Sequence, residues 1–215
     1  MAPENSSLFS MTDEQAMWRV QTQDDPEAFA QIVRRWEGPI QRLCVRMTGD
    51  FHRGQDLAQE AFARLFTRRK LWQPTAKLST WLWRIAINLC HDQQRRQQRR
   101  PEGALAEGFA DEEGPLDHVA TLSASPAESL EDQEQADIVR LALQKLPETH
   151  RVVVVLRHYE GLKFREVAEV LGIPEGTVKS RMTDALAQLA RHLAPHVERA
   201  AQRRQFPTPT LSIAL

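Results

Sequence analysis

Hydroxyl and cationic side chains gather in one short segment near the carboxyl end of the chain. The residues are Thr177, Lys179, Ser180, Arg181 and Thr183. In a helix, the three hydroxyl residues share the face opposite the apolar pair Val178 and Met182, and the two cations flank that face. Small hydroxyl groups can hydrogen-bond base edges in the major groove, while lysine and arginine contact phosphates. The segment therefore predicts a DNA-reading helix, although a polar face that only meets water would have the same spacing.

A second segment combines aromatic side chains with arginine. Its helical projection places four apolar residues inward, namely Leu78, Leu82, Ile85 and Leu89. The residues placed outward are Thr80, Trp83, Arg84, Ile87, His91 and Arg95. An exposed aromatic ring beside arginines suits unpaired bases, because bases stack on the ring and the cations hold the backbone. The segment predicts a site for single-stranded nucleic acid, and packing in the core is the alternative for any one tryptophan.

An acid–amide–acid pattern occurs at Asp56, Gln59 and Glu60. Residues three and four apart lie on one face of a helix. Carboxylates on such a face can form charge-assisted hydrogen bonds with arginines of a partner protein. The pattern predicts a docking surface, with an ordinary solvated helix face as the alternative.

No arrangement of residues predicts catalysis or a metal centre. The seven histidines are scattered, and neither an H-E-x-x-H motif nor a nucleophile elbow occurs. Cys90, His91 and Asp92 are consecutive, so on a helix their side chains point about 100° apart and do not converge. The two cysteines, Cys44 and Cys90, form no C-x-x-C pattern, which excludes a disulfide framework and a structural zinc site. We expect no enzyme activity and no cofactor.

The net charge of −1 hides a segregation of charge along the chain. Ten acidic residues and no lysine or arginine lie between residues 101 and 136. Without those ten, 28 basic residues stand against 19 acidic ones, a net charge of +9. Two basic parts joined by an acidic part favour polyanions as partners.

The chain contains neither a long apolar run nor a basic start followed by an apolar stretch. We therefore expect no membrane insertion and no secretory signal. Unpaired cysteines are typical of a reducing compartment, so the expected location is the cytoplasm.

The elements that must hold these side chains are predicted to be helices. Apolar residues recur at three- and four-residue spacing through residues 29–47, 57–66 and 78–89, and Asp25-Pro26 is typical of a helix start. Near the carboxyl end, two short amphipathic segments flank Gly172. This pattern is typical of a helix-turn-helix. The predicted fold is all-α, with two small helical domains and a flexible acidic linker. The predicted boundaries are 1–24 for an N-terminal extension, 25–100 for the first domain, 101–135 for the linker, 136–193 for the second domain and 194–215 for a tail.

The second domain resembles domain four of bacterial sigma factors, in the extracytoplasmic-function group. The resemblance rests on LQKLPETHRVVVVLRHYEGLKFREVAEVLGIPEGTVKSRMTDAL within residues 141–190. It implies a helix-turn-helix that reads the minus-thirty-five promoter element through Thr177, Lys179, Ser180, Arg181 and Thr183. One departure is Asp184, where members of the family often carry arginine. This acid could accept a hydrogen bond from a cytosine amino group, or pair with Lys179 or Arg181.

The first domain resembles sigma domain two over residues 28–100. DLAQEAFARLF is similar to the segment that contacts core RNA polymerase in the family. This similarity assigns Asp56, Leu57, Gln59 and Glu60 to that site, with Leu57 packing the lobe. KLSTWLWRIAINLCHDQQRRQQRR is similar to the helix that melts and reads the minus-ten element. The residues assigned to it are Trp81, Trp83, Arg84, Asn88, His91, Arg95 and Arg96, and the loop 71–76 is the family's pocket for a flipped base.

Together these resemblances imply an alternative sigma factor that binds core RNA polymerase and directs promoter recognition and transcription initiation. They also imply an anti-sigma factor that clamps both domains. The alternative is a helix-turn-helix regulator that acts without replacing the housekeeping sigma factor. Such regulators share the GTVK-type helix, but they lack the DLAQE segment and the WLWRIAIN helix.

Overall fold

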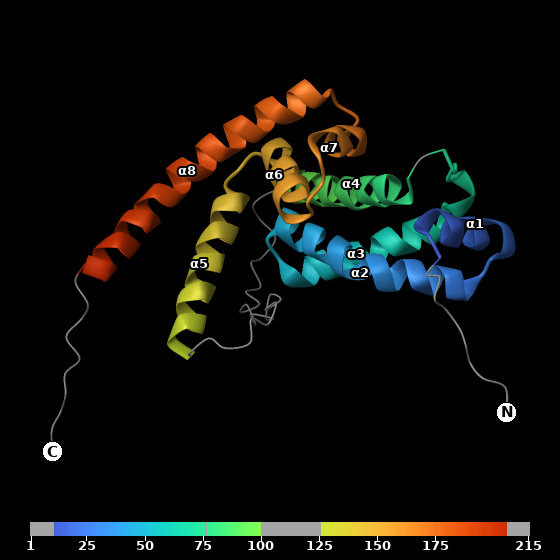
Figure 1. The fold of residues 1–215 in the computed structure, drawn as a ribbon, viewed down its shortest axis with the longest axis horizontal. Helices are drawn as coiled ribbons and strands as arrows, with labels where there is room; N and C mark the ends of the chain where they lie inside the picture. Colours follow the sequence, from blue (N-terminus) through green and yellow to red (C-terminus); the bar gives the residue numbers. More distant parts are fainter. Residues whose placement is uncertain (1–10, 76, 100–125, 206–215) are drawn as a thin grey trace, which may run out of the picture.

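The computed structural model describes residues 11–75, 77–99 and 126–205 of the chain. Every regular element in these residues is helical, which confirms the predicted all-α fold (Figure 1). The N-terminal lobe consists of α1 (Asp13–Gln23), α2 (Pro26–Thr48), α3 (Phe51–Thr67), the short 3-10 helix η1 (Arg69–Leu71) and α4 (Leu78–Arg99). The C-terminal lobe consists of α5 (Pro126–Gln144), α6 (Glu148–Val154), the π-helical turn η2 (Val155–Tyr159), α7 (Phe164–Leu171) and α8 (Glu175–Gln205).

Polar side chains fix where the first three helices begin. Thr12 accepts a hydrogen bond from the backbone N–H of Gln15 at 3.2 Å, and the Gln15 side chain accepts one from the Thr12 N–H at 3.0 Å. Asp25 caps α2, as predicted, and the hydrogen bond from the Ala28 N–H is the main reason why the pKa of Asp25 is lowered. Asp50 caps α3 in the same way. These caps satisfy N–H groups that the first turn of a helix leaves without partners.

The close crossing of α2 and α3 depends on one glycine. A Cβ atom at Gly54 would lie 2.6 Å from the backbone nitrogen of Val45, a separation that real Cβ atoms do not show. The absence of a side chain at Gly54 therefore lets the two helices approach. Both helices bury their apolar faces, and α4 packs against this pair with Leu78, Leu82, Ile85 and Leu89 inward, as predicted.

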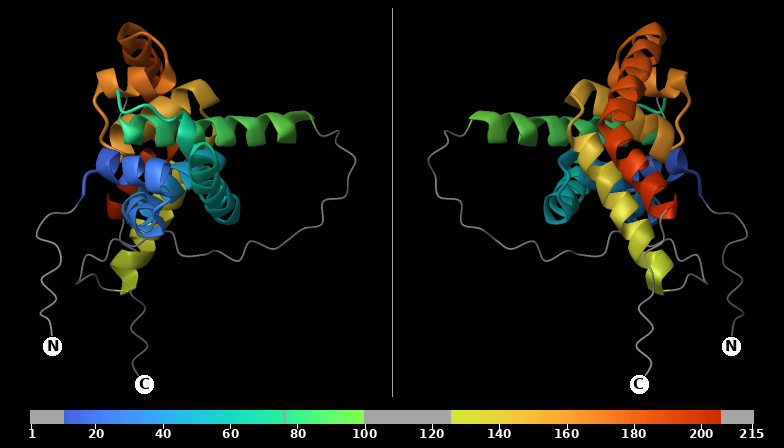
Figure 2. Two further views of the ribbon diagram at one scale, coloured as in Figure 1. Left: turned by 90° about the vertical axis from the view of Figure 1, so that its right-hand side faces the viewer. Right: turned by 90° about the vertical axis from the view of Figure 1, so that its left-hand side faces the viewer.

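The two lobes lie directly against each other. Helix α7 packs on α4, while α5, α6 and η2 contact α2 (Figures 1 and 2). One cluster of buried apolar side chains includes Leu82 and Ile85 of α4 together with Val167 and Val170 of α7. The two lobes therefore share a core, which the sequence did not predict.

A buried arginine also holds the lobes together. Arg151 of α6 is only 5% exposed, and its guanidinium donates to backbone carbonyls on both sides of the lobe boundary. Its acceptors are Met47 O at 2.6 Å, Gln144 O at 2.8 Å, Leu143 O at 3.0 Å and Leu146 O at 3.1 Å. The last three belong to the end of α5 and the turn after it, and Met47 lies near the end of α2. One side chain thus satisfies carbonyls at the ends of two helices from different lobes.

Three helices extend past the predicted domain boundaries. Helix α1 lies within the predicted extension 1–24, yet it buries Ala16, Met17 and Val20 in the N-terminal lobe. Helix α5 begins at Pro126, inside the predicted linker 101–135, because proline and nearby acids favour the first turn of a helix. Helix α8 continues to Gln205, beyond the predicted end of the second domain. The predicted linker before residue 126 and the predicted tail after residue 205 lie outside the described residues.

Candidate functional site

The helix-turn-helix prediction is confirmed in its local geometry. Helix α7 ends at Gly172, whose φ of +66° is the left-handed conformation that a C-cap glycine adopts. The carbonyl of Pro174 then accepts from the N–H groups of Thr177 and Val178, which starts α8. Val178 is fully buried and Met182 is partly buried against the core, so α8 packs by its predicted apolar pair. The opposite face of its first turns is consequently directed to solvent.

The hydroxyl residues of α8 occupy that outer face. Ser180 and Thr183 are exposed and Thr177 is partly exposed. The Ser180 hydroxyl donates to Thr177 O at 3.0 Å, and the Thr183 hydroxyl donates to Lys179 O at 3.1 Å. These back-bonds within the helix leave the oxygen lone pairs available, and the hydroxyls can rotate toward a base.

The charged groups around this face do not pair as the sequence suggested. Lys179 forms an ion pair with Glu175 at 2.7 Å, one helical turn away. Asp184 lies 3.9 Å from the ring of His150 in α6 and is 67% exposed, so it takes neither Lys179 nor Arg181 as its partner in this structure. Lys179 pairs with Glu175 because residues four apart lie on the same face of a helix.

The acid–amide–acid residues are on the surface of α3. Asp56, Gln59 and Glu60 are exposed, and Leu57 is partly buried against the core, as predicted. Glu60 pairs with Arg64 at 2.7 Å, one turn further along the helix. An exposed pair of this kind contributes little stability, so Glu60 can exchange its partner at low cost.

Helix α4 does not present all the residues predicted to face outward. Trp83 is only 4% exposed and Ile87 is buried as well, so the outward placement of both is wrong. The ring of Trp83 meets the edge of Trp36 in α2, with centroids 5.7 Å apart and an interplanar angle of 87°. The helical projection assumed that α4 buries only one face. Because other elements cover α4 on more than one side, its buried face is wider, which explains the error.

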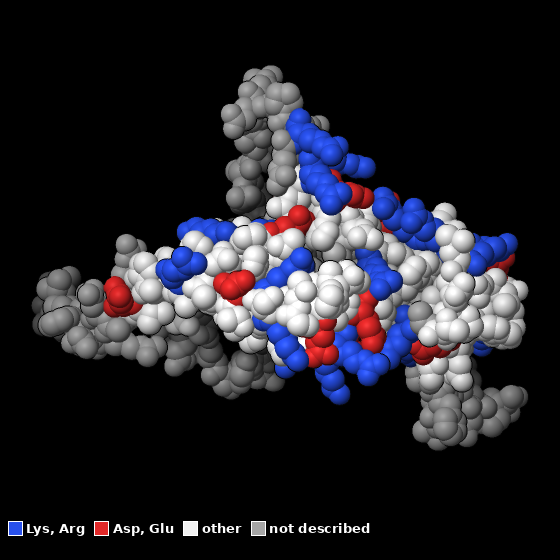
Figure 3. All heavy atoms as spheres, turned by 90° about the horizontal axis from the view of Figure 1, so that it is seen from above, with Lys and Arg blue, Asp and Glu red and all other residues white. Residues whose placement is uncertain are grey.

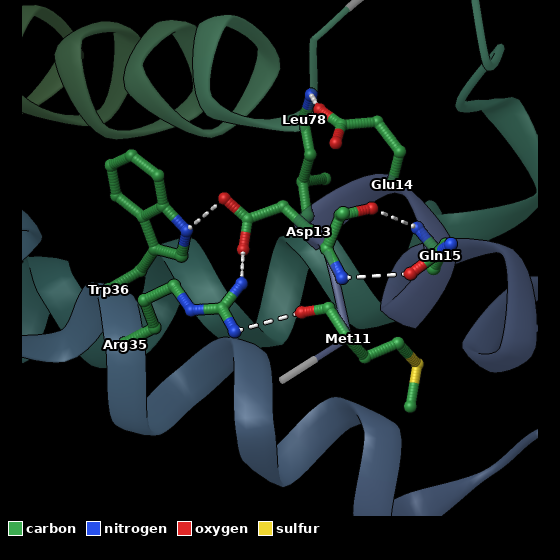
Figure 4. Close-up of polar contacts among 8 residues, drawn as sticks. Met11, Asp13, Glu14, Gln15, Arg35, Trp36 and Leu78 are labelled. Atoms are coloured by element: carbon green, nitrogen blue, oxygen red, sulfur yellow. Dashed lines mark hydrogen bonds and ion pairs between the residues drawn. The ribbon is translucent and has the colours of Figure 1, made fainter. Parts of the chain in front are cut away.

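Helix α1 holds the Trp36 side of this pair, as Figure 4 shows. The Trp36 ring nitrogen donates to an Asp13 carboxylate oxygen at 3.0 Å, and Arg35 pairs with the other oxygen of the same carboxylate. Glu14 accepts from the backbone N–H of Leu78 at 3.4 Å, at the start of α4. The amino end of α1 therefore positions α2 and α4. Sequence reasoning missed this role, although the T-x-x-Q capping pattern before α1 could have indicated the helix.

Two of the predicted minus-ten residues contact the C-terminal lobe, although Arg84 stays exposed and His91 partly exposed. Arg84 donates through Nε to Val170 O at 3.0 Å, and through Nη2 to Glu169 O. The His91 ring lies 3.4 Å from a carboxylate oxygen of Glu148 in α6. Burial lowers the pKa of His91, and the carboxylate of Glu148 opposes that shift only in part.

The remaining minus-ten residues are accessible. Asn88, Arg95 and Arg96 are exposed, and Trp81 is partly buried against the core. The last turns of α4 project beyond the rest of the two lobes (Figure 2). Lysine and arginine side chains are scattered over the face seen in Figure 3, with fewer acids among them. This end of α4 offers cations that can reach a phosphate backbone.

The loop before α4 and helix α1 line an open hollow of about 460 Å³. Trp72 and Pro74 of the loop and Trp18 of α1 contribute to its mostly apolar lining. Trp72 is 3% exposed, and its backbone oxygen accepts from the Gln21 side chain at 3.0 Å. Its ring nitrogen has no hydrogen-bond partner among the described residues. The predicted pocket loop is therefore held by α1, while Ala76 lies outside the described residues.

Reactive groups do not gather elsewhere in the described residues. No three histidine, cysteine, aspartate or glutamate side chains there form a metal-binding group. Cys44 and Cys90 are free and buried, and a hydrogen bond between the two thiols, followed by burial, raises the pKa of Cys90. A thiol held in its neutral form is a weak nucleophile. No helix in the described residues is long and apolar enough to cross a membrane.

Comparisons with known families match both lobes. Residues 32–100 match the family described as Sigma-70 region 2, and residues 136–189 match Sigma-70, region 4. The ECF RNA polymerase sigma factor SigW of Bacillus subtilis is 34% identical over 171 residues, which are 79% of this chain and 90% of SigW. The RNA polymerase sigma-H factor of Pseudomonas aeruginosa is 34% identical over 190 residues, which are 87% of this chain and 97% of that protein.

Solved structures have the same fold. CnrH in complex with the cytosolic domain of CnrY superposes with a TM-score of 0.62 at 23% identity, covering 85% of this chain and 97% of CnrH. The sigma factor RpoE from Bartonella quintana, in complex with the anti-sigma factor NepR, gives a TM-score of 0.60 at 19% identity. That match covers 78% of this chain and 98% of RpoE.

Proposed function

Because the chain belongs to the ECF RNA polymerase sigma factors, we propose which of its exposed surfaces contacts each promoter element and core polymerase. The protein is an alternative sigma factor that binds core RNA polymerase and directs transcription initiation. Catalysis of RNA synthesis belongs to core polymerase, and the protein acts with it in the cytoplasm, on the nucleoid. One observation supports this assignment. The C-terminal lobe carries an exposed polar face on α8, and the N-terminal lobe carries an exposed basic end on α4.

The outer face of α8 reads the minus-thirty-five element. Thr177, Ser180 and Thr183 lie where a groove-inserted helix meets base edges, and Lys179 and Arg181 lie beside them where phosphates pass. Asp184 is exposed at the end of this face, where it can accept from a cytosine amino group.

Helix α4 and the loop before it read the minus-ten element as a single strand. Asn88, Arg95 and Arg96 are the exposed groups that hold the strand, with Trp81 beside them. Trp83 does not stack on a base in this arrangement, because it is buried against Trp36. It positions α4, and thereby the residues of α4 that contact DNA.

The α3 face formed by Asp56, Gln59 and Glu60 contacts core polymerase. All three side chains are exposed, and carboxylates there can pair with arginines of the polymerase. An anti-sigma factor is a further partner, since the similar RpoE structure contains the anti-sigma factor NepR.

Run-off transcription with purified core polymerase tests this function. A promoter library transcribed with and without the protein should yield specific starts only when the protein is present. The double variant Asp56→Arg with Glu60→Arg should lose these starts and fail to associate with core in a pull-down, while its circular dichroism stays normal because both residues are exposed. Tight, sequence-specific binding to duplex DNA without core, and no effect on initiation, would support the regulator alternative instead.

A further inference from the structure

Most of the described loop between η1 and α4 is exposed. Gln73, Pro74 and Thr75 are open to solvent, whereas Trp72 at the start of the loop is only 3% exposed. Apolar burial therefore anchors the loop at one end only. Because the proposed function assigns this loop to the minus-ten element, the groups that fix the rest of its conformation bear on which bases it accepts.

The side chain of Gln21 in α1 fixes the first part of the loop. Its amide nitrogen donates to Trp72 O at 3.0 Å and to Lys70 O at 3.3 Å. The last carbonyls of a helix have no partner within the helix, so a side-chain donor at the end of η1 satisfies groups that would otherwise be open. Asp24, just after α1, also pairs with Arg69 of η1 at 2.5 Å.

Glu14 of the same helix fixes the other end of the loop. One of its carboxylate oxygens accepts from the N–H of Leu78, the first residue of α4, at 3.4 Å (Figure 4). Glu14 and Gln21 are seven residues apart, so they lie on one face of α1 and are separated by about 10 Å along its axis. Helix α1 therefore sets the distance between the two ends of the loop.

The same helix forms part of the hollow beside the loop. Trp18 of α1 lines the open hollow together with Trp72 and Pro74 of the loop. The separation of helix and loop, and with it the shape of the hollow, depends on the hydrogen bonds made by Glu14 and Gln21. Selectivity for an unpaired base follows from the shape of the surface that receives it.

We propose that Glu14 and Gln21 are positioning residues for minus-ten recognition: by fixing both ends of the loop, they determine how strongly the loop prefers one base over another. Neither side chain needs to touch DNA. The inference rests on the proposed function, because it requires that the loop reads this element. Helix α1 ends before residue 32, where the match to Sigma-70 region 2 begins, so this role belongs to a part of the chain outside that match.

A promoter library with randomised minus-ten and minus-thirty-five elements, transcribed by the holoenzyme, tests the inference. Sequencing of the transcribed templates gives the base preference at each position. Gln21→Met keeps the length of the side chain and removes its donor, so it should reduce the preference for the favoured base at one or more minus-ten positions by about fivefold. The minus-thirty-five preferences, which belong to α8, should not change. Gln23→Met, at the exposed end of the same helix, is the matched control and should keep both sets of preferences.

Glu14 provides an independent pair of variants. Glu14→Gln loses the charge but keeps an oxygen that can accept from the Leu78 N–H, whereas Glu14→Met loses both the charge and the acceptor. We expect Glu14→Gln to retain the minus-ten preference and Glu14→Met to lose it as Gln21→Met does. A general loss of stability would instead lower transcription from all templates without changing the relative use of the four bases.

The outcomes separate this inference from the proposed function. If the wild type shows minus-ten preferences that Gln21→Met and Glu14→Met both keep, the inference is wrong and the proposed function stands. Equal losses in Gln21→Met and Gln23→Met would contradict the inference too. If Gln21→Met fails to fold, the comparison of Glu14→Gln with Glu14→Met decides the question. A wild-type holoenzyme without specific starts would overturn the proposed function and, with it, the inference.

Discussion

At the scale of single residues, the helix-turn-helix separates groups that read sequence from groups that supply affinity. Ser180 and Thr177 are on the outer face of α8, whereas Arg181 lies at its flank. Base contacts discriminate between sequences and phosphate contacts do not. Substitutions at these positions should therefore have different kinds of effect.

Ser180→Ala should change which upstream elements are used, by about 1–3 kcal/mol for a lost base contact. Arg181→Ala should weaken all promoters alike and reduce the slope of log affinity against log salt by about one. Run-off transcription from a set of minus-thirty-five variants at several salt concentrations measures both effects. An unchanged promoter preference in Ser180→Ala would remove Ser180 from base reading.

His91 should make stability depend on pH near neutrality. Burial lowers its pKa in the folded protein from the ordinary value of 6.5, so the unfolded chain binds more protons between the two pKa values. Stability should accordingly fall as the pH drops from about 7 through this window. Glu148 and Asp92 oppose the shift and Arg95 adds to it, so all three belong to the same titration.

The measurement is the urea midpoint at a series of pH values for wild type and His91→Gln. The variant should lose part of the decline on the acid side. If both proteins decline in parallel, the folded and unfolded states bind the same number of protons at His91.

At the scale of elements, α1 acts as a brace for the helices behind the minus-ten site. The Asp13 carboxylate pairs with Arg35 and accepts a hydrogen bond from the ring nitrogen of Trp36. Trp36 in turn packs on the buried Trp83 of α4. This line of contacts runs from α1 through α2 to α4. It lies in part outside residues 32–100, which match the family.

Asp13→Ala should therefore cost about 2 kcal/mol, because hydrogen bonds to a charged group are among the stronger ones. Glu27→Gln is the matched control, since Glu27 and its partner Arg34 are 2.6 Å apart but mostly exposed. The control should change stability by about 0.5 kcal/mol or less. Equal losses in urea unfolding would show that α1 is no more than a surface helix.

At the scale of the whole molecule, the lobes are joined by polar groups whose hydrogen-bond partners come from both lobes. Arg151 is the clearest case, because its four carbonyl acceptors come from α2, α5 and the turn after α5. Burial lowers the pKa of this guanidinium, although Glu148 opposes the shift. Its donated hydrogen bonds offset the cost of placing it there.

Arg151→Leu should lower stability by about 3 kcal/mol or more, because it leaves several buried carbonyls without donors. It should also reduce carbodiimide cross-linking of Lys77 to Glu166, an ion pair between the lobes at 3.3 Å, since the bond to Met47 O joins the lobes. Urea unfolding and the cross-linking assay measure the two effects. A loss of stability with an unchanged cross-link would confine Arg151 to the C-terminal lobe.

The sequence by itself determined the helical elements and the chemistry of their outer faces. Asp25-Pro26 began a helix, Gly172 ended one, and Val178 and Met182 packed inward as their spacing required. These features are local, since a cap or an amphipathic period depends on residues within a few turns. The exposed faces of α3 and α8 followed from the same periods.

Only the tertiary structure decided which faces were covered. Trp83 and Ile87 had the spacing of outward residues, but neighbouring elements bury them. Arg84 was assigned to DNA by resemblance, yet its partners are carbonyls more than 80 residues away, in α7. The packing of one lobe on the other rests on contacts between residues distant along the chain, and helical periodicity carries no information about such contacts. For that reason the sequence predicted both lobes, but not the arrangement that closes one over the other.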